Sequence, residues 1–280
     1  MPSKVYTAFV RVKVKKYISV TKIKMIPLHF HFNYLQGTGN FPWRELYTLS
    51  LISCHEMTSA VKIVVHYDKP GDGPHWNEAF ALPYVEWKLV TPIDVINGHK
   101  VSDCRVLSDS LRLKILLEEG GFHSDLNFIF IRNFELLRHN TAVIGEQLPR
   151  THKLNNSLLG AVPNCLFIKA YLSHYDCHWT PKELKKIHNF RRVIPSNLST
   201  RYTITVLPKK NLYPIACSTK SFFEEAQVCL KDSYAVCLWN RLDITKEKLT
   251  KSVIAKNIRI IFEGYSSKIQ LGLDVMLRFD

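Results

Sequence analysis

The segment from 121 to 127 carries the residues whose types and spacing are best suited to chemistry. Its alternation predicts a strand on which His123, Asp125 and Asn127 share one face. A carboxylate and an amide oxygen two residues apart can bind one hard cation, because such cations prefer oxygen ligands. An exposed polar face on an edge strand gives the same pattern, so the spacing alone leaves both interpretations open.

The residues before this segment predict a helix that must position it. Asp109 and Arg112 are three apart, so both project from the same side of that helix. Gly120-Gly121 would end it, because glycine adopts the left-handed conformation that closes many helices. Apolar residues recur at intervals of four and form one face: Leu107, Leu111 and Ile115. An ion pair on a helix surface remains the alternative interpretation of Asp109 and Arg112.

Composition bounds the class of protein. The 280 residues are 46% hydrophobic and 22% charged, which is ordinary for a folded globular chain, and their number suits one large domain or one domain with an appended lobe. The formal net charge of +14 favours polyanions, phosphate-bearing ligands or acidic membrane surfaces as partners. The seven cysteines are scattered without a C-x-x-C pair, so we expect a reducing compartment and a soluble, cytoplasmic protein. No apolar run is long enough to predict a membrane span, and no signal peptide is expected.

The order of predicted elements indicates an α/β fold. Up to residue 134 the patterns predict strands at 25–35, 61–67 and 85–90, with helices at 43–57 and 76–80 between them. Such alternation is typical of a mainly parallel sheet flanked by helices. Later in the chain the signals are weaker: strands at 142–146 and 203–207, a helix or strand at 164–173, a basic helix at 181–187, and a strand or turn at 234–239.

We divide the chain into three regions. Residues 1–24 mix lysines with β-branched residues, which predicts one or two strands with a charged face or, alternatively, a basic strip resting on a membrane or an acidic partner. Residues 25–241 form the main domain. Residues 242–280 are expected to add a helix and a β-hairpin packed on that domain.

Four motifs, taken in order, make the chain resemble the DxD-containing glycosyltransferases of the family 32 type, relatives of the α-1,4-galactosyl- and N-acetylglucosaminyltransferases. The central block is the specific part of the resemblance, which covers roughly residues 25–241. The matching residues are Ile26-Pro27-Leu28-His29-Phe30-His31-Phe32, then Ser108, Asp109, Arg112, Ile115, Leu116, Gly120 and Gly121, then His123, Asp125 and Asn127, and finally Tyr234-Ala235-Val236-Cys237-Leu238-Trp239-Asn240.

The resemblance implies a GT-A fold of Rossmann type, a donor such as a UDP-linked hexose, N-acetylhexosamine or xylose, a glycan acceptor, and Mn²⁺ or Mg²⁺. It implies that Asp109 binds a donor sugar hydroxyl and that Arg112 lies near the diphosphate. Asp125 would bind the ribose or the metal, with Asn127 as a second metal ligand. It also implies that Ile26, Pro27, His31 and Phe32 lie beside the uracil and that Cys237 occupies a metal-ligand position. Trp239 and Asn240 either close over the donor or cap the core. Glu146 is a candidate to face the anomeric carbon, and Asn155 and Asn156 are candidates to line the acceptor pocket.

Two departures from the family pattern weaken a hard-cation site. Asn127 is neutral where the family has a second carboxylate, and Cys237 replaces a histidine. Either the metal arrives with the donor, or protein cations such as Arg112 and nearby lysines replace it. The alternatives to an enzyme are a catalytically silent protein that binds sugar nucleotides and a basic nucleic-acid-binding protein, although no binding module for nucleic acid is recognisable. A homodimer and peripheral membrane contact stay open. The sugar-transfer interpretation requires Asp125 and Asn127 at a cleft on the side of Asp109.

Overall fold

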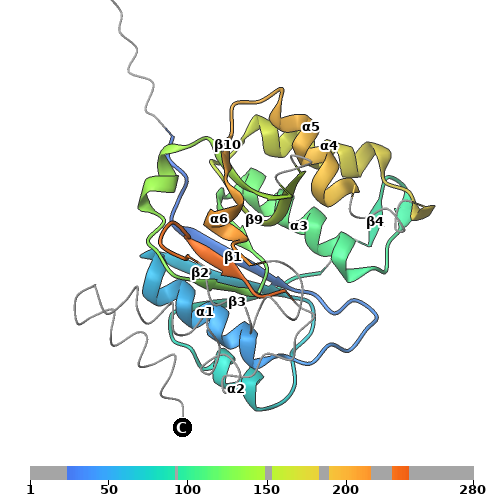
Figure 1. Cartoon of the computed structure of the whole chain (residues 1–280). Helices are drawn as coiled ribbons and strands as arrows, with labels where there is room; N and C mark the ends of the chain where they lie inside the picture. Colours follow the sequence, from blue (N-terminus) through green and yellow to red (C-terminus); the bar gives the residue numbers. More distant parts are fainter. Residues whose placement is uncertain (1–23, 92–93, 149–152, 183–188, 216–228, 240–280) are drawn as a thin grey trace, which may run out of the picture.

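The computed structural model describes residues 24–91, 94–148, 153–182, 189–215 and 229–239 (Figure 1). Its centre is a seven-stranded sheet in the order β10-β8-β9-β6-β1-β2-β3. In chain order the strands are β1 (His29–Tyr34), β2 (Lys62–Tyr67), β3 (Val85–Leu89), β6 (Gly121–Ser124), β8 (Ala142–Leu148), β9 (Lys153–Ala161) and β10 (Thr205–Leu207). The predicted regions 1–24 and 242–280 lie outside the described residues, apart from Lys24.

The sheet is mainly parallel, which confirms the predicted fold class. β1 pairs in parallel with both β2 and β6, β2 with β3, and β10 with β8. Only β9 runs antiparallel to its neighbours β6 and β8 within this sheet. Two small antiparallel pairs complete the described strands: β7 (Phe128–Phe130) with β11 (Ala235–Cys237), and β4 (Val95–Ile96) with β5 (His99–Lys100).

The alternating side chains of β1 point to the two opposite faces of the sheet. Phe30 and Phe32 are fully buried on one face, where Phe30 stacks on Phe122 and meets Phe130 edge-on with ring centroids 5.5 Å apart. Each such ring contributes about 1.5–3 kcal/mol by leaving water. The opposite face carries Asn33, whose amide donates to the backbone oxygen of Ser108 at 2.9 Å. This hydrogen bond joins the central strand to the helix that shapes the site.

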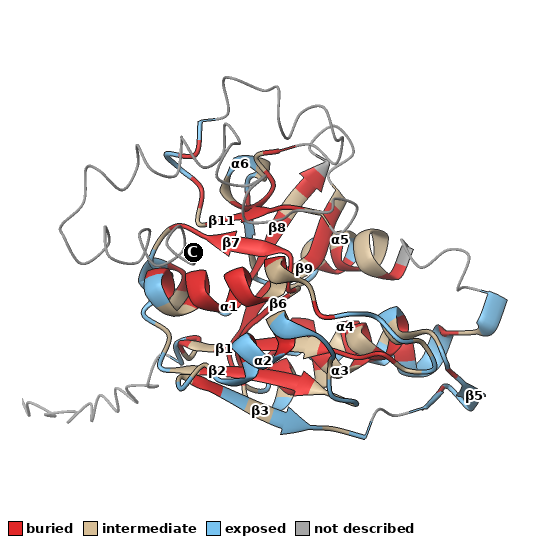
Figure 2. Ribbon diagram, turned by 90° about the horizontal axis from the view of Figure 1, so that it is seen from below, coloured by how far each residue is buried: buried red, intermediate tan, exposed pale blue. Residues whose placement is uncertain are grey.

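Helices cover both faces of the sheet, with α1 and α2 on one side and α3, α4 and α5 on the other (Figure 1). The sheet is buried throughout its middle, while the outer helices keep exposed surfaces (Figure 2). None of the described helices is both long and apolar enough to cross a membrane. Their bounds are α1 (Glu45–Thr58), α2 (Pro74–Phe80), α3 (Cys104–Glu118), α4 (Leu166–His178), α5 (Ile194–Ser199) and α6 (Lys209–Leu212), with a 3₁₀ turn (Glu135–His139) and a π turn (Asn189–Val193).

The turn from α3 into β6 depends on its paired glycines, as predicted. Gly120 and Gly121 have φ of 68° and 96°, a backbone conformation that L-residues with a side chain rarely adopt. A Cβ on Gly121 would also lie 2.5 Å from the backbone oxygen of His29. The glycines therefore allow β6 to lie directly beside β1.

The predicted polar row on a single strand is wrong. β6 ends at Ser124, and the N–H of Asp125 makes one more bond to β9, donating to the backbone oxygen of Ser157 at 2.7 Å. Residues 126 and 127 form a turn, and β7 then begins in a different sheet. His123 is buried in the main sheet, while Asp125 is partly exposed just past the carboxyl end of β6.

Candidate functional site

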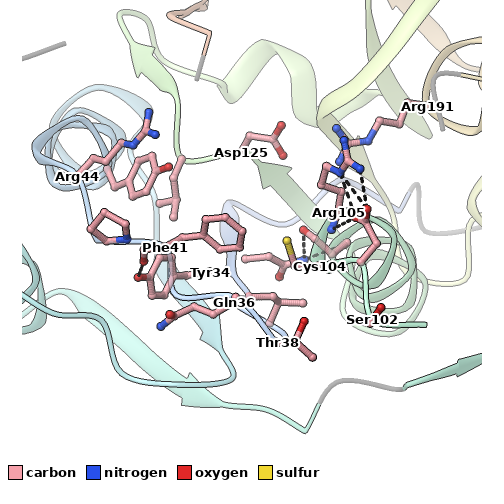
Figure 3. A pocket seen from close by; sticks show the side chains of 18 residues that line it. Tyr34, Gln36, Thr38, Phe41, Arg44, Ser102, Cys104, Arg105, Asp125 and Arg191 are labelled. Atoms are coloured by element: carbon pink, nitrogen blue, oxygen red, sulfur yellow. Dashed lines mark hydrogen bonds and ion pairs between the residues drawn. The ribbon is translucent and has the colours of Figure 1, made fainter. Parts of the chain in front are cut away.

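A cavity of about 670 Å³ opens at the carboxyl ends of β1 and β6 (Figure 3). From β1 the chain continues to β2 and β3 on one side, whereas β6 lies on the other side of β1. Loops diverge where the strand order reverses, and ligands of open α/β sheets bind in the crevice this creates. The lining comes from residues 33–36, 38, 39, 41 and 42 after β1, 44 and 47 at α1, 102–105 and 108 at α3, 125 and 126 after β6, and 191.

The loop after β1 forms one wall of the cavity and is held in place by Asp68. The carboxylate of Asp68 accepts hydrogen bonds from the backbone N–H groups of Gln36 and Gly37, each at 2.8 Å. Tyr34 donates its hydroxyl proton to the backbone oxygen of Phe41. Aromatic rings of Tyr34 and Phe41 therefore line a fixed wall, which suits stacking against a planar base.

The amino end of α3 forms the opposite wall. Asp103 caps the helix by accepting a hydrogen bond from the N–H of Arg105 at 2.9 Å, and the Arg105 side chain folds back onto the same carboxylate, with Nη2 2.6 Å from Oδ2. Partial burial raises the pKa of Asp103, but the hydrogen bonds from Arg105 outweigh it and hold that pKa below its usual value. The helix amino end and this guanidinium both favour an anion in the cavity.

Four side chains of alternating charge form a series of ion pairs, whose two ends lie at the cavity wall and whose middle is buried. Arg191 donates to Asp109 through Nε at 2.6 Å and Nη2 at 3.1 Å. Nη2 of Arg112 lies 3.9 Å from the same carboxylate and donates to Asp125. The inner pair, Asp109 and Arg112, is at most 1% exposed, while Asp125 and Arg191 are 23% and 24% exposed. Arg191 and Asp125 thus bring opposite charges to the cavity wall, fixed from behind by a buried pair.

Asp109 is enclosed by further donors from β9 and α4. Asn156 donates to it from β9 at 3.2 Å, and the hydroxyl of Tyr175 donates from α4 at 3.3 Å. Burial, reinforced by the charge of Asp109, raises the pKa of Tyr175 well above its ordinary value, so the phenol stays protonated as a donor. Burial alone would lower the pKa of Arg191, but Asp109 raises it above the ordinary value. The carboxylate is a structural anchor for its neighbours.

Some of the predicted site residues line the cavity, and others lie behind its wall or away from it. Asp125 lines the cavity. Asp109 and Arg112 lie directly behind the wall, since both are buried and neither lines the cavity. Glu146 is half-buried on β8, which β9 separates from β6, and it does not line the cavity.

The residues predicted beside the uracil lie away from the cavity. His31 and Phe32 are buried within β1, and Ile26 is buried before its amino end, with Pro27 half-buried next to it. The cavity instead uses the carboxyl end of the same strand, because parallel strands expose their backbone to ligands at that end.

The remaining predicted residues gather around β7 and β11. The N–H of Leu238 donates to the backbone oxygen of Asn127 at 2.8 Å, and Cys237 pairs with Phe128. Asn127 and Cys237 are both buried, and neither lines the cavity. Trp239 is half-buried and donates through Nε1 to the backbone oxygen of Ile215 at 3.3 Å. Asn240 lies outside the described residues.

A resident divalent cation does not fit these residues. The buried Oδ1 of Asn127 has no hydrogen-bond partner among the described residues, so one oxygen ligand is available. Asp125, however, is engaged by Arg112. Cys237 offers sulfur, a poor ligand for Mn²⁺ or Mg²⁺. Within the described ranges, no three His, Cys, Asp or Glu side chains lie together as a metal site would require. Mn²⁺ and Mg²⁺ are bound mainly by oxygens, commonly including carboxylates, and this set provides too few.

Sequence reasoning missed Arg105 and Arg191, which line the cavity together with Arg44 (Figure 3). Arg105 carries a readable signal, since it follows an aspartate at a helix start. Arg191 carries none, because it lies 82 residues from its partner Asp109 in a segment without clear periodicity.

Comparison with known proteins agrees with the motif pattern. A family model described as the alpha 1,4-glycosyltransferase conserved region matches residues 182–259. Over 152 residues the chain is 30% identical to lactosylceramide 4-alpha-galactosyltransferase of Pongo pygmaeus, a match that covers 49% of this chain and 67% of that protein. The chain belongs to the alpha-1,4-glycosyltransferase family.

The matches to this chain cover different shares of the length of each relative. The enzyme of the same name from Rattus norvegicus is also 30% identical over 152 residues, and this match spans 41% of its length. Among solved structures, the glycosyltransferase GlyE of Streptococcus pneumoniae TIGR4 aligns with a TM-score of 0.48 at 11% identity, covering 89% of this chain and 62% of that one. The region that the family model matches includes Arg191 and β11.

Proposed function

We propose that the protein transfers a sugar from a nucleotide-sugar donor to a glycan acceptor. The observation that carries this proposal is the cavity at the reversal of strand order, where the α3 amino end, Arg105 and Arg191 meet beside the aromatic wall. A base fits the aromatic side, and a diphosphate fits the cationic side. The donor is expected to be UDP-linked, with a hexose, an N-acetylhexosamine or xylose.

The reaction needs charge stabilisation more than it needs a base. A bond forms between an acceptor hydroxyl oxygen and the anomeric carbon, the bond from that carbon to the phosphate oxygen breaks, and the departing diphosphate takes the electron pair. The hydroxyl proton is lost to the diphosphate or to water. Preorganised cations at the leaving group lower the barrier to such a step. Arg105, Arg191 and the α3 amino end supply them, and no step is assigned to a metal, because the donor set does not fit one.

Two carboxylates from the described residues line the cavity, and both are paired. Asp103 binds Arg105, and Asp125 binds Arg112. Oxygens that already accept hydrogen bonds from an arginine are less available to take a proton from the acceptor hydroxyl. Asp125 is better suited to accept hydrogen bonds from the donor's ribose or sugar hydroxyls than to activate the acceptor.

A transfer assay tests the proposal. The names of the relatives make UDP-galactose and lactose-terminated acceptors the first pair to try, followed by the other UDP-sugars. We expect release of UDP that increases when acceptor is added. Binding of UDP-sugar without release would instead favour the silent sugar-nucleotide-binding alternative. Retention by DNA or RNA with steep salt dependence would favour a nucleic-acid-binding protein. A cytoplasmic location and the monomeric or dimeric state stay predictions.

A further inference from the structure

Among the residues that the structure describes, the cavity lacks the ligands for a cation, but it has two arginines in a matched arrangement. Each arginine binds one carboxylate of α3 through the same two nitrogens. Nε and Nη2 of Arg105 bind Asp103, with Nη2 2.6 Å from Oδ2. Nε and Nη2 of Arg191 bind Asp109 at 2.6 Å and 3.1 Å. For both arginines, Nη1 has no hydrogen-bond partner in the part of the chain that the structure describes.

The two guanidinium groups lie close together at one end of the cavity, as Figure 3 shows. The pKa of Arg105 is raised, chiefly by its hydrogen bond to Asp103, while the charge of Arg191 acts against that increase. Two like charges at one wall repel each other, and an anion between them would relieve the repulsion. The first turn of α3 adds its partial positive charge at the same place.

The arginines are held by carboxylates that a ligand would not disturb. Asp109 is fully buried, and Asp103 serves as the helix cap. The cationic wall is therefore fixed before a ligand arrives, which lowers the cost of ordering it on binding.

We propose that Arg105 and Arg191 neutralise the donor diphosphate in place of a chain-bound divalent cation, so that the nucleotide binds without metal. This inference rests on the proposed function and deepens it. Nη1 of each arginine donates to one phosphate, and the two phosphates of the nucleoside diphosphate span the pair.

Binding of UDP to the full chain, measured by titration calorimetry in EDTA and again in Mn²⁺, tests the inference without any activity measurement. We expect affinities within about threefold of each other in the two buffers. Arg105→Gln removes a charge-assisted hydrogen bond, so UDP should bind roughly tenfold more weakly, while uridine binding should stay unchanged. Arg201→Gln is the matched control, because Arg201 is exposed and does not line the cavity.

Arg105 suits this test because its side chain is 55% exposed and its removal leaves the buried charges intact. Binding of UDP in Mn²⁺ but not in EDTA would overturn the inference and leave the proposed function standing. Absence of UDP binding in both buffers would overturn both. Equal affinities of Arg105→Gln and the wild-type chain for UDP would show that the diphosphate lies elsewhere and would also overturn the inference.

Discussion

Replacing Asp109 by asparagine removes the negative charge that lies between two arginines in the interior. Arg112 is 1% exposed and Arg191 is 24% exposed, so neither guanidinium can be fully hydrated after the change. In the wild-type chain the donors around residue 109 share two carboxylate oxygens. The asparagine amide offers them only one oxygen, and its NH₂ group would face the remaining donors. Asp109→Asn therefore leaves buried donors without an acceptor.

The size of the effect follows from the contacts. Asp109 accepts two hydrogen bonds from Arg191, at 2.6 Å and 3.1 Å, and weaker ones from Asn156 and Tyr175 at 3.2 Å and 3.3 Å. Removing one partner of a buried charged pair costs about 3–5 kcal/mol, because the other charge remains buried. We expect Asp109→Asn to lower the free energy of unfolding by an amount in that range.

Asp103→Asn is the matched control, since Asp103 also lies at α3 and pairs with an arginine. There the arginine is 55% exposed, so the pair is worth about 0.2–1 kcal/mol, and asparagine caps a helix nearly as well as aspartate. Urea denaturation followed by circular dichroism measures both variants. If Asp109→Asn cost no more than Asp103→Asn, the buried alternation of charges would not exist as described, and the reasoning would be refuted.

Two further predictions concern the core. Gly121→Ala should lower the free energy of unfolding by at least about 1–3 kcal/mol more than Gly98→Ala, since both glycines have positive φ but only Gly121 has a backbone oxygen 2.5 Å from the added Cβ. Equal losses in a denaturation experiment would contradict this. Burial lowers the pKa values of His31 and His66 to about 3 from an ordinary 6.5, so the unfolded chain binds protons that the folded chain does not. Stability should therefore be fully present above pH 6.5 and fall as the pH drops toward 3, and melting curves across that range should show a shallower fall for His31→Gln.

The sequence predicts the strands in which apolar residues dominate, but it does not predict a strand that contains buried polar residues. β1, β2 and β3 follow from their apolar and β-branched content. β9 was not predicted, because Asn155 and Asn156 interrupt its apolar pattern. In the structure both are buried and find partners, Asn155 donating to Gln147 at 2.8 Å and Asn156 to Asp109. Sequence alone cannot show which polar residues will find such partners.

In the site, too, the sequence predicts what depends on local spacing and does not predict what depends on long-range contacts. The relation of Asp109 to Arg112 followed from helical spacing, but their burial did not, since it depends on α4 and Arg191 covering the outer side of α3. The alternation after Gly121 suggested a strand up to residue 127, but pairing with β9 ends with the bond from Asp125 to Ser157, and residues 126 and 127 form a turn that leads to β7. Arg191 reaches the cavity only because the chain returns to α3, a long-range contact that no local pattern encodes.

A crystal structure of the full chain with UDP bound tests the central claim most directly. Our account places the uracil beside Tyr34 and Phe41, and the diphosphate at the amino end of α3 with oxygens about 3 Å from Nη1 of Arg105 and Arg191. A nucleotide bound away from this cavity, or a diphosphate held by other groups, would contradict it.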